Sequence, residues 1–242
     1  MSTETLPTVA EIAGLIDHAI LKPELTRAEV DAQLDTAARY SIFSVCVRPS
    51  DIAHSVARLS GSGVLTGTVI GFPHGTTSSQ AKAAEARQAV ADGASELDMV
   101  LNIGRLRSGL IEDVEDDIRA VVDAADGTLV KVILETAFLT DEQIVAGCQA
   151  AERAGADFVK TSTGFAGGGA TIPHLKLMRA SVSEGVEVKA SGGVRDLDTL
   201  LQMRALGVTR FGTSATATIL DDLAHRIETG SAAANTSDHA SY

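Results

Sequence analysis

Short apolar runs alternate with longer amphipathic segments along almost the whole chain. The runs are rich in β-branched and aliphatic residues, which is typical of buried strands. They cover residues 15–21, 43–47, 65–71, 96–101, 129–134, 158–163, 186–190 and 209–212. A segment with helical periodicity follows each run, and the pair repeats at intervals of roughly 25–35 residues, as in a βα unit. Eight such units predict a single (β/α)8 barrel, or TIM barrel, of the α/β class.

Helix start and stop signals support the same repeat. Thr8 with Glu11 and Thr26 with Glu29 have the spacing of capping boxes. The predicted helices begin after Thr8, after Thr26 and at Pro49, and continue with 79–92, 111–125, 141–154, 173–184, 197–206 and 215–228. An open, doubly wound sheet is the competing arrangement, but no Gly-x-Gly-x-x-Gly follows an early strand. We therefore expect a barrel with a short N-terminal helix over residues 1–228 and a flexible tail over 229–242.

Chain length and composition fit one soluble barrel. The chain has 242 residues, and no apolar run in it approaches the roughly 20 residues of a membrane span. The N-terminus lacks a signal segment, and Cys46 and Cys148 match no metal or redox spacing, so we expect a cytoplasmic protein. The net charge of −12 argues against nucleic acid and membranes as partners. An anionic substrate must therefore meet a local positive pocket.

Charged residues interrupt the predicted central strands. Asp98, Lys131, Lys160 and Lys189 each lie inside an apolar run. A buried ammonium is unfavourable unless it is paired or neutralised, and a neutral lysine is a nucleophile. Lys160 and Lys189 lie on consecutive strands, so each should make the other easier to deprotonate if both point into the barrel. Asp98 could then relay protons to and from the amine.

A purely structural interpretation of these charges must be weighed against the catalytic one. A single strand lysine usually extends its amine to solvent or to an edge, and Lys131 could simply pair with Asp98 or Glu135. Three lysines and an aspartate in the central strands make the two interpretations about equally favourable, because buried charges are rarely unpaired.

Glycine-rich loops follow the last strands. Gly192 and Gly193 come directly after the strand of Lys189, and Ser214 has the matching place after the final strand. Backbone amides at such turns bind phosphate, and barrel phosphate sites typically use these loops. Gly164 and the run 167–169 could close over a ligand. Any single loop of this kind is more often just a tight turn, but three on one rim favour phosphate.

Other candidate groups carry weaker signals. The six histidines do not cluster with carboxylates at ligand spacing, so we expect no metal site. Asp17 and His18 could lie at the rim, although a hydrogen-bonded structural pair is the favoured interpretation. Cys46, within a strand, is expected to be a small buried apolar residue.

Five motifs, taken in order, resemble those of the deoxyribose-phosphate aldolases. They are ELDMV at 96–100, VKVILET at 130–136, FVKTSTG at 158–164, VKASGGVR at 188–195 and RFGTS at 210–214. The segments IDH at 16–18 and LKP at 21–23 resemble the N-terminal signature of the same family. The resemblance covers about residues 8–225. It implies a class I aldolase on a (β/α)8 barrel that splits 2-deoxyribose 5-phosphate into glyceraldehyde 3-phosphate and acetaldehyde, in the catabolism of deoxyribonucleosides.

The resemblance also implies residue roles. Lys160 would form the Schiff base, Lys189 would lower its pKa and assist proton transfer, and Asp98 would shuttle protons. Lys131 and Asp17 would support them. Gly164, Gly192, Gly193 and Ser214 would hold the phosphate.

The resemblance leaves some positions open. Some relatives carry a basic residue where this chain has Phe165, and some end in a tyrosine that folds over the site, as Tyr242 could. No cofactor is implied, and the expected partners are a small phosphorylated sugar, short aldehydes and a second copy in a homodimer. A Schiff-base aldolase for another sugar phosphate, a sugar-phosphate isomerase and a catalytically inactive barrel are the alternatives.

Overall fold

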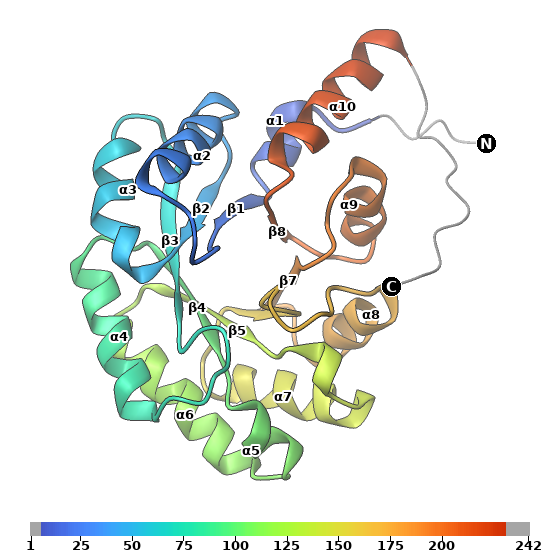
Figure 1. The fold of residues 1–242 in the computed structure, drawn as a ribbon. Helices are drawn as coiled ribbons and strands as arrows, with labels where there is room; N and C mark the ends of the chain where they lie inside the picture. The colour runs from blue at the N-terminus through green and yellow to red at the C-terminus, as the bar shows by residue number, and fades with distance from the viewer. Residues whose placement is uncertain (1–5, 231–242) are drawn as a thin grey trace.

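The computed structural model describes residues 6–230, in which eight parallel strands close into a barrel (Figure 1). The strands are β1 (Ile16–Ile20), β2 (Ser44–Val47), β3 (Leu65–Ile70), β4 (Glu96–Val100), β5 (Leu129–Ile133), β6 (Phe158–Lys160), β7 (Glu187–Ser191) and β8 (Arg210–Thr213). Each strand pairs with the next in the sequence, and β8 pairs with β1, with Ile16 opposite Phe211. The predicted (β/α)8 barrel is confirmed, because each apolar run forms its strand and the helical segments between them make the parallel order possible.

Helices surround the barrel on its outside (Figure 1). The α-helices are α1 (Val9–Ala13), α2 (Arg27–Arg39), α3 (Ile52–Arg58), α4 (Ser79–Ala91), α5 (Ile103–Arg107), α6 (Ile111–Ala124), α7 (Asp141–Arg153), α8 (Ile172–Ser181), α9 (Leu197–Arg204) and α10 (Thr216–Thr229). The predicted capping boxes at Thr8 and Thr26 are both present, and in each the backbone amide of the threonine donates to the carboxylate of the glutamate three residues on. These two helix starts could be predicted from the sequence because a capping box consists of hydrogen bonds between residues only three positions apart.

Pro49 is the first residue of a helix, as predicted, in η1 (Pro49–Asp51), which leads directly into α3. Two other short helices, α5 and η2 (Thr136–Phe138), were not predicted. Each is too short to show a helical period, and α5 begins with a cap from the Asn102 side chain to the Arg105 amide. The predicted helix over 173–184 also ends earlier, at Ser181.

Strand β6 is shorter than its apolar pattern predicts. It ends at Lys160, although the run continues to Thr163. The Thr163 amide donates to the Glu135 carboxylate (3.1 Å), and the Thr163 hydroxyl bonds to the same oxygen. Glu135 itself has left-handed backbone angles (φ 59°). Backbone pairing continues to Thr161, whose amide donates to the Lys189 carbonyl (3.2 Å). At Thr163 the Glu135 side chain is the partner instead, where the chain turns into the following loop.

The apolar core lies between the strands and the helices rather than inside the barrel. Alternate strand residues such as Leu97, Val132, Val188 and Phe211 are fully buried in this outer layer. Several of the residues between them are charged, and in the register Lys160 lies opposite Lys189. The interior of the barrel is therefore an ionic cluster enclosed by an apolar shell.

Within residues 6–230, none of the helices has the length and apolar character of a membrane span. The predicted tail begins at residue 229, where α10 ends, and residues 231–242 lie outside the described part of the chain. Tyr242 is among them.

Candidate active site

Asp98 joins the two lysines that the sequence singles out. Its Oδ2 atom accepts a hydrogen bond of 2.7 Å from Nζ of Lys160 and another of 2.7 Å from Nζ of Lys189. The three side chains come from β4, β6 and β7 and are at most 4 % exposed. The barrel thus brings together residues that are 91 positions apart in the sequence around one carboxylate oxygen.

Lys131 lies on the other side of the same carboxylate. Its Nζ atom donates to Oδ1 of Asp98 (3.0 Å) and to Oε2 of Glu96 (2.7 Å). The expected pair with Asp98 is present, whereas Glu135 instead contacts the loop after β6. Lys131 therefore holds Asp98 by one oxygen and leaves the other oxygen to the two lysines.

Asp17 and Arg210 complete the cluster from β1 and β8. Asp17 accepts from Lys189 (2.5 Å) and from Arg210 (2.9 Å), and Arg210 also bonds to Glu96 (3.0 Å). The Arg210 guanidinium lies 3.6 Å from the centre of the Phe43 ring, which covers its other surface. The sequence analysis missed Glu96 and Arg210 as members of this cluster, although both begin strands that carry other motif residues.

The cluster has one more cation than carboxylates. Among the described residues, the ion pairs link three carboxylates, Asp17, Glu96 and Asp98, with four basic groups, Lys131, Lys160, Lys189 and Arg210. The interior is therefore electrically balanced when one of the four basic groups is neutral. Removing that proton relieves the burial of an excess charge.

Lys160 is the base whose surroundings favour the neutral form. Burial lowers its pKa; Asp98 acts in the opposite direction, and the nearby Lys189 ammonium lowers it further. The sequence analysis emphasised repulsion between the two ammonium groups, whereas burial is the larger cause in the structure. The net direction still agrees with the expectation of a reactive amine.

The neighbours of Lys160 stay charged. Burial alone would lower the pKa of Lys189, but Asp17 and Asp98 outweigh it and raise that pKa. Burial would raise the pKa of Asp98, yet Lys131, Lys160 and Lys189 bring it well below its usual range. Lys189 is thus held as an ammonium and Asp98 as a carboxylate while Lys160 is free to lose its proton.

A cavity of about 630 Å³ opens above this cluster. Its lining includes the predicted site residues Asp17, Gly164, Lys160, Lys189, Gly192, Gly193 and Ser214. Asp98 and Lys131 lie beneath Lys160 and Lys189 rather than in the lining. Lys22 and Arg195 also face the cavity, and both are exposed cations for which the sequence analysis proposed no separate role.

The glycine turn after β7 forms part of the rim. Gly192 and Gly193 have positive φ values of 77° and 83°, which only glycine adopts readily. The Thr213 hydroxyl donates to the Val194 carbonyl (2.6 Å) and ties this turn to β8. Asp196 caps α9 by accepting from the Thr199 amide (2.8 Å). Because the Asp196 carboxylate already occupies the start of α9, the amides of the Gly192–Gly193 turn are better placed to bind an anion than the amides of α9 are.

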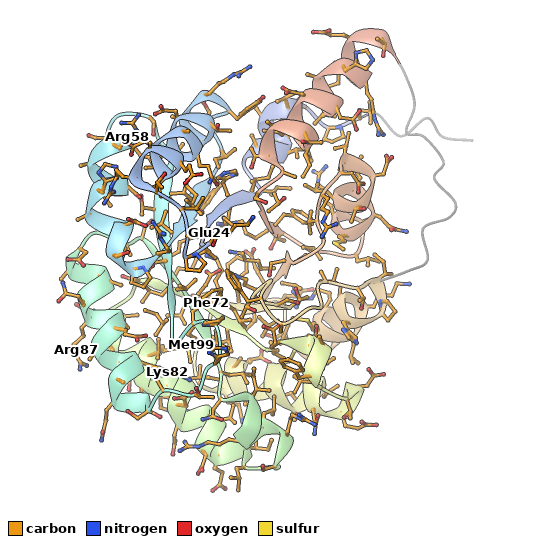
Figure 2. The ribbon with its side chains drawn as sticks, in the orientation of Figure 1. Glu24, Arg58, Phe72, Lys82, Arg87 and Met99 are labelled. Atoms are coloured by element: carbon orange, nitrogen blue, oxygen red, sulfur yellow. The ribbon has the colours of Figure 1, made fainter. Side chains whose placement is uncertain are left out.

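Phe165 occupies the position at which some relatives carry a basic residue. Its ring is half-exposed and stands edge-on to Phe72, with 5.2 Å between the ring centres; Phe72 is labelled inside the ring of helices in Figure 2. It borders both the main cavity and a neighbouring, mostly apolar cavity of about 310 Å³. This position therefore supplies an aromatic wall and no charge.

The expected pairing of Asp17 with His18 is wrong. Successive strand residues point to opposite faces, so Asp17 faces the barrel interior while Nδ1 of His18 bonds to Thr216 (2.8 Å) in the helical layer. Burial lowers the pKa of His18. Cys46 is buried as expected, and burial raises the pKa of its thiol to about 11, but it also contributes to the cavity lining.

The described residues contain no group of three or more His, Cys, Asp or Glu side chains arranged to hold a metal ion.

Sequence relatives match this chain over most of its length. A model of the DeoC/LacD family of aldolases matches residues 12–214. A deoxyribose-phosphate aldolase of Staphylococcus haemolyticus is 51 % identical over 211 residues, which are 87 % of this chain and 96 % of the relative. Deoxyribose-phosphate aldolase 2 of Staphylococcus aureus is 52 % identical over the same shares of the two chains.

Solved structures match the barrel as well. The aldolase QR15 aligns with a TM-score of 0.86 and 35 % identity, covering 90 % of this chain and 98 % of that one. The deoxyribose phosphate aldolase of Aeropyrum pernix, whose structure is described as tetrameric, aligns with a TM-score of 0.83 and 29 % identity over 90 % and 92 % of the two chains. Together with the matched family model, these similarities show that the chain belongs to the DeoC/LacD family of aldolases.

Proposed function

We propose that the chain catalyses the reversible cleavage of 2-deoxy-D-ribose 5-phosphate to D-glyceraldehyde 3-phosphate and acetaldehyde, with Lys160 as the Schiff-base residue. The observation that carries the residue assignment is the shared Asp98 oxygen, 2.7 Å from Nζ of both Lys160 and Lys189 beneath the cavity. The named relatives are aldolases of this substrate. Both lines of support point to an amine that becomes neutral and attacks a carbonyl.

The reaction begins when neutral Lys160 attacks the aldehyde carbon of the open-chain sugar. A carbon–nitrogen bond forms, the carbonyl oxygen takes up a proton, and loss of water leaves a protonated imine. Lys189 stays an ammonium because Asp17 and Asp98 raise its pKa, so it supplies a fixed positive charge next to the reacting nitrogen. Asp98 accepts hydrogen bonds from both nitrogens and is placed to pass a proton between them.

The imine then acts as the electron sink for carbon–carbon cleavage. A base removes the proton of the C3 hydroxyl, the C2–C3 bond breaks, and its electron pair moves into the imine to give an enamine. Glyceraldehyde 3-phosphate leaves, and a proton added to C2 returns the imine. Water hydrolyses this imine, which releases acetaldehyde and regenerates neutral Lys160. We assign the proton transfers to Asp98 with bound water and Lys189.

The phosphate is assigned to the loops at the cavity rim. Gly164, Gly192, Gly193 and Ser214 are among the residues that line the cavity, and backbone amides at glycine turns bind phosphate oxygens well. Arg195, which follows the turn and faces the same cavity, is a cation that meets the need for local positive charge in a chain of net charge −12.

The proposal also covers the role of Tyr242, self-association and cellular location. Tyr242 lies outside the described residues, so its part in proton exchange stays a prediction. Self-association into a homodimer is also a prediction. A cytoplasmic location fits the two cysteines, Cys46 and Cys148, which are both buried free thiols.

Chemical trapping tests the assignment directly. Borohydride added in the presence of acetaldehyde should inactivate the enzyme and leave an N-ethyl group on the peptide that contains Lys160, as mass spectrometry can show. A label on a peptide without Lys160 contradicts the proposal. A sugar-phosphate isomerase forms no imine and would resist inactivation. Product assays with acetone in place of acetaldehyde separate an aldolase for another sugar phosphate from the one proposed.

A further inference from the structure

The glycine run after β6 does not stand free above the cavity. Gly168 and Gly169 are both partly buried, and the space for a side chain is already filled at each. A Cβ on Gly169 would lie 2.4 Å from the carbonyl oxygen of Gly192, and a Cβ on Gly168 would lie 2.5 Å from Cβ of Ala137. Neither glycine needs a positive φ, so steric contact alone requires glycine at these two positions. The run therefore packs between η2 on one side and the turn after β7 on the other.

Hydrogen bonds connect the run to the turn after β7. The Ala170 amide donates to the Ser191 carbonyl (3.1 Å) and to the Gly192 carbonyl (2.9 Å). The Ser191 hydroxyl donates back to the Ser162 carbonyl (2.5 Å). The run is thus joined to the turn by a close backbone contact and by the Ala170 amide, and the Ser191 hydroxyl joins the turn to the segment just after β6.

On its other side, the glycine run packs against the loop after β5. Glu135 is buried and bonds to both the amide and the hydroxyl of Thr163. The Thr136 amide donates to the Thr161 carbonyl (3.0 Å). Ala137, which follows directly, is the residue that Gly168 touches. The loop after β5 therefore supports the glycine run, and the glycine run supports the turn after β7.

We propose that Gly168 and Gly169 are positioning residues that set the height of the Gly192–Gly193 turn above Lys160, and so set the affinity of the site for the phosphate of its substrate. This inference rests on the proposed role of that turn in binding phosphate. In this proposal residues 167–169 support the turn in a fixed position, whereas the sequence had suggested that they could close over a ligand. Because the amides of the turn act through direction and distance, a displacement of the order of 1 Å should weaken phosphate binding strongly.

The first test adds a methyl group at the contact. In Gly169→Ala the new Cβ collides with backbone atoms of Gly192, which cannot rotate away, so the turn must shift. We expect KM for glyceraldehyde 3-phosphate to rise about 10-fold or more, while KM for unphosphorylated glyceraldehyde stays near its wild-type value. The rate of borohydride trapping with acetaldehyde, which reports on Lys160 alone, should not change.

The second test adds and then removes the same clash. Gly168→Ala brings a methyl group against the Ala137 side chain, and Ala137→Gly takes away the atom that it meets. The single variant Gly168→Ala should raise KM for the phosphorylated aldehyde, and the double variant should restore it. If Gly168→Ala acted only by destabilising the fold, Ala137→Gly would not restore KM for the phosphorylated aldehyde. This pair of variants therefore tests the positioning role even if Gly169→Ala folds poorly.

Gly167→Ala is the matched control. Gly167 has a φ of 75°, and nothing lies within 4 Å of its added Cβ, so this variant strains the local backbone without pushing on the turn. It should keep the wild-type ratio of the two KM values. The same disturbance in all three variants would mean that the loop is merely destabilised, and it would overturn the positioning role.

The wild-type protein separates this inference from the proposed function beneath it. If wild type shows no preference for the phosphorylated aldehyde and no competitive inhibition by inorganic phosphate, then the phosphate site itself is refuted. If wild type shows both, but Gly168→Ala and Gly169→Ala keep the wild-type ratio of KM values, then only the positioning role is refuted.

Discussion

Lys160 and Lys82 are both buried lysines paired with an aspartate, yet only Lys160 faces a cavity. Lys82 lies on α4 with its side chain 0 % exposed, and its Nζ atom donates to Oδ2 of Asp117 (2.6 Å) and to the Val100 carbonyl (2.8 Å) (Figure 2). Burial is the largest cause of a lowered pKa at both lysines. A lowered pKa therefore does not by itself identify a reactive amine.

The surroundings of the two amines explain the difference. Lys82 joins α4 to α6 and to the end of β4, where a carbonyl and a carboxylate accept its hydrogen bonds. Lys160 shares its carboxylate with a second ammonium and borders open space. A catalytic lysine needs a neighbouring cation and room for a carbonyl substrate, whereas a structural lysine needs enclosure and a partner of its own.

The strongest test of this comparison is removal of the amine that faces the cavity. Lys160→Met should lower the aldol rate by at least about 10⁴-fold, because the covalent route is lost. It should also abolish borohydride trapping with acetaldehyde, while far-UV circular dichroism shows an intact barrel. Activity that persists at the wild-type level would mean that another lysine forms the imine.

Lys189→Met should have the next largest effect, a fall in turnover of about 10²–10⁴-fold. Lys160 attacks as the neutral amine, so the rate of imine formation rises with pH until the pH passes the Lys160 pKa. Removing the Lys189 charge takes away an interaction that lowers this pKa, so the rising limb should move to higher pH. Borohydride inactivation rates across pH measure the shift.

Lys189→Arg is the matched control for that shift. Arginine keeps the positive charge but gives up protons far less readily, so its pH limb should stay near that of wild type while turnover remains low. If the limb of Lys189→Met coincides with that of wild type, then Lys189 has no electrostatic effect on Lys160.

Lys82→Met should instead affect folding. It leaves the Asp117 carboxylate buried without its cation, which should cost about 3–5 kcal/mol in the free energy of unfolding. Activity per folded molecule and trapping at Lys160 should stay at wild-type levels. The double variant Lys82→Met with Asp117→Leu should recover much of the loss. Urea unfolding measures both, and a Lys82→Met protein that folds stably but has lost activity would break the comparison.

The smallest effect is expected at Ser79. Its hydroxyl donates to Oδ1 of Asp117 (2.8 Å), so Ser79→Ala removes one hydrogen bond and leaves the ion pair in place. We expect a loss of about 1 kcal/mol in the free energy of unfolding and no change in turnover. A loss as large as that of Lys82→Met would show that the serine, rather than the lysine, maintains the buried carboxylate.

The sequence predicted the repeating strands and helices because period and helix caps are local properties. The sequence also identified Asp98, Lys160 and Lys189 as charged residues inside strands, but it left open whether they point into the barrel. The prediction failed where a distant side chain changes local structure. Strand β6 ends three residues earlier than the apolar run, and Thr163, the last residue of that run, bonds to the Glu135 side chain from the preceding loop instead of to a neighbouring strand.

Two members of the ionic cluster, Glu96 and Arg210, also escaped sequence reasoning. Arg210, Glu96 and Asp17 meet across the barrel from β8, β4 and β1, and their separations in sequence reach 193 residues. Lys82 gave no signal at all, because it lies in an alanine-rich helix whose pattern does not reveal that the amine points inward. Closure of the sheet decides these contacts.

By itself, the sequence determined the barrel class, the order of its units and which strands carry ionisable groups, since each of these follows from the spacing of residues along the chain. Only the tertiary structure decided which lysine borders the cavity beside a second ammonium, and which glycines lie in steric contact with a neighbouring segment. The physical reason is that a pKa and a steric contact depend on distances between segments far apart in the chain, and only the closed barrel sets those distances.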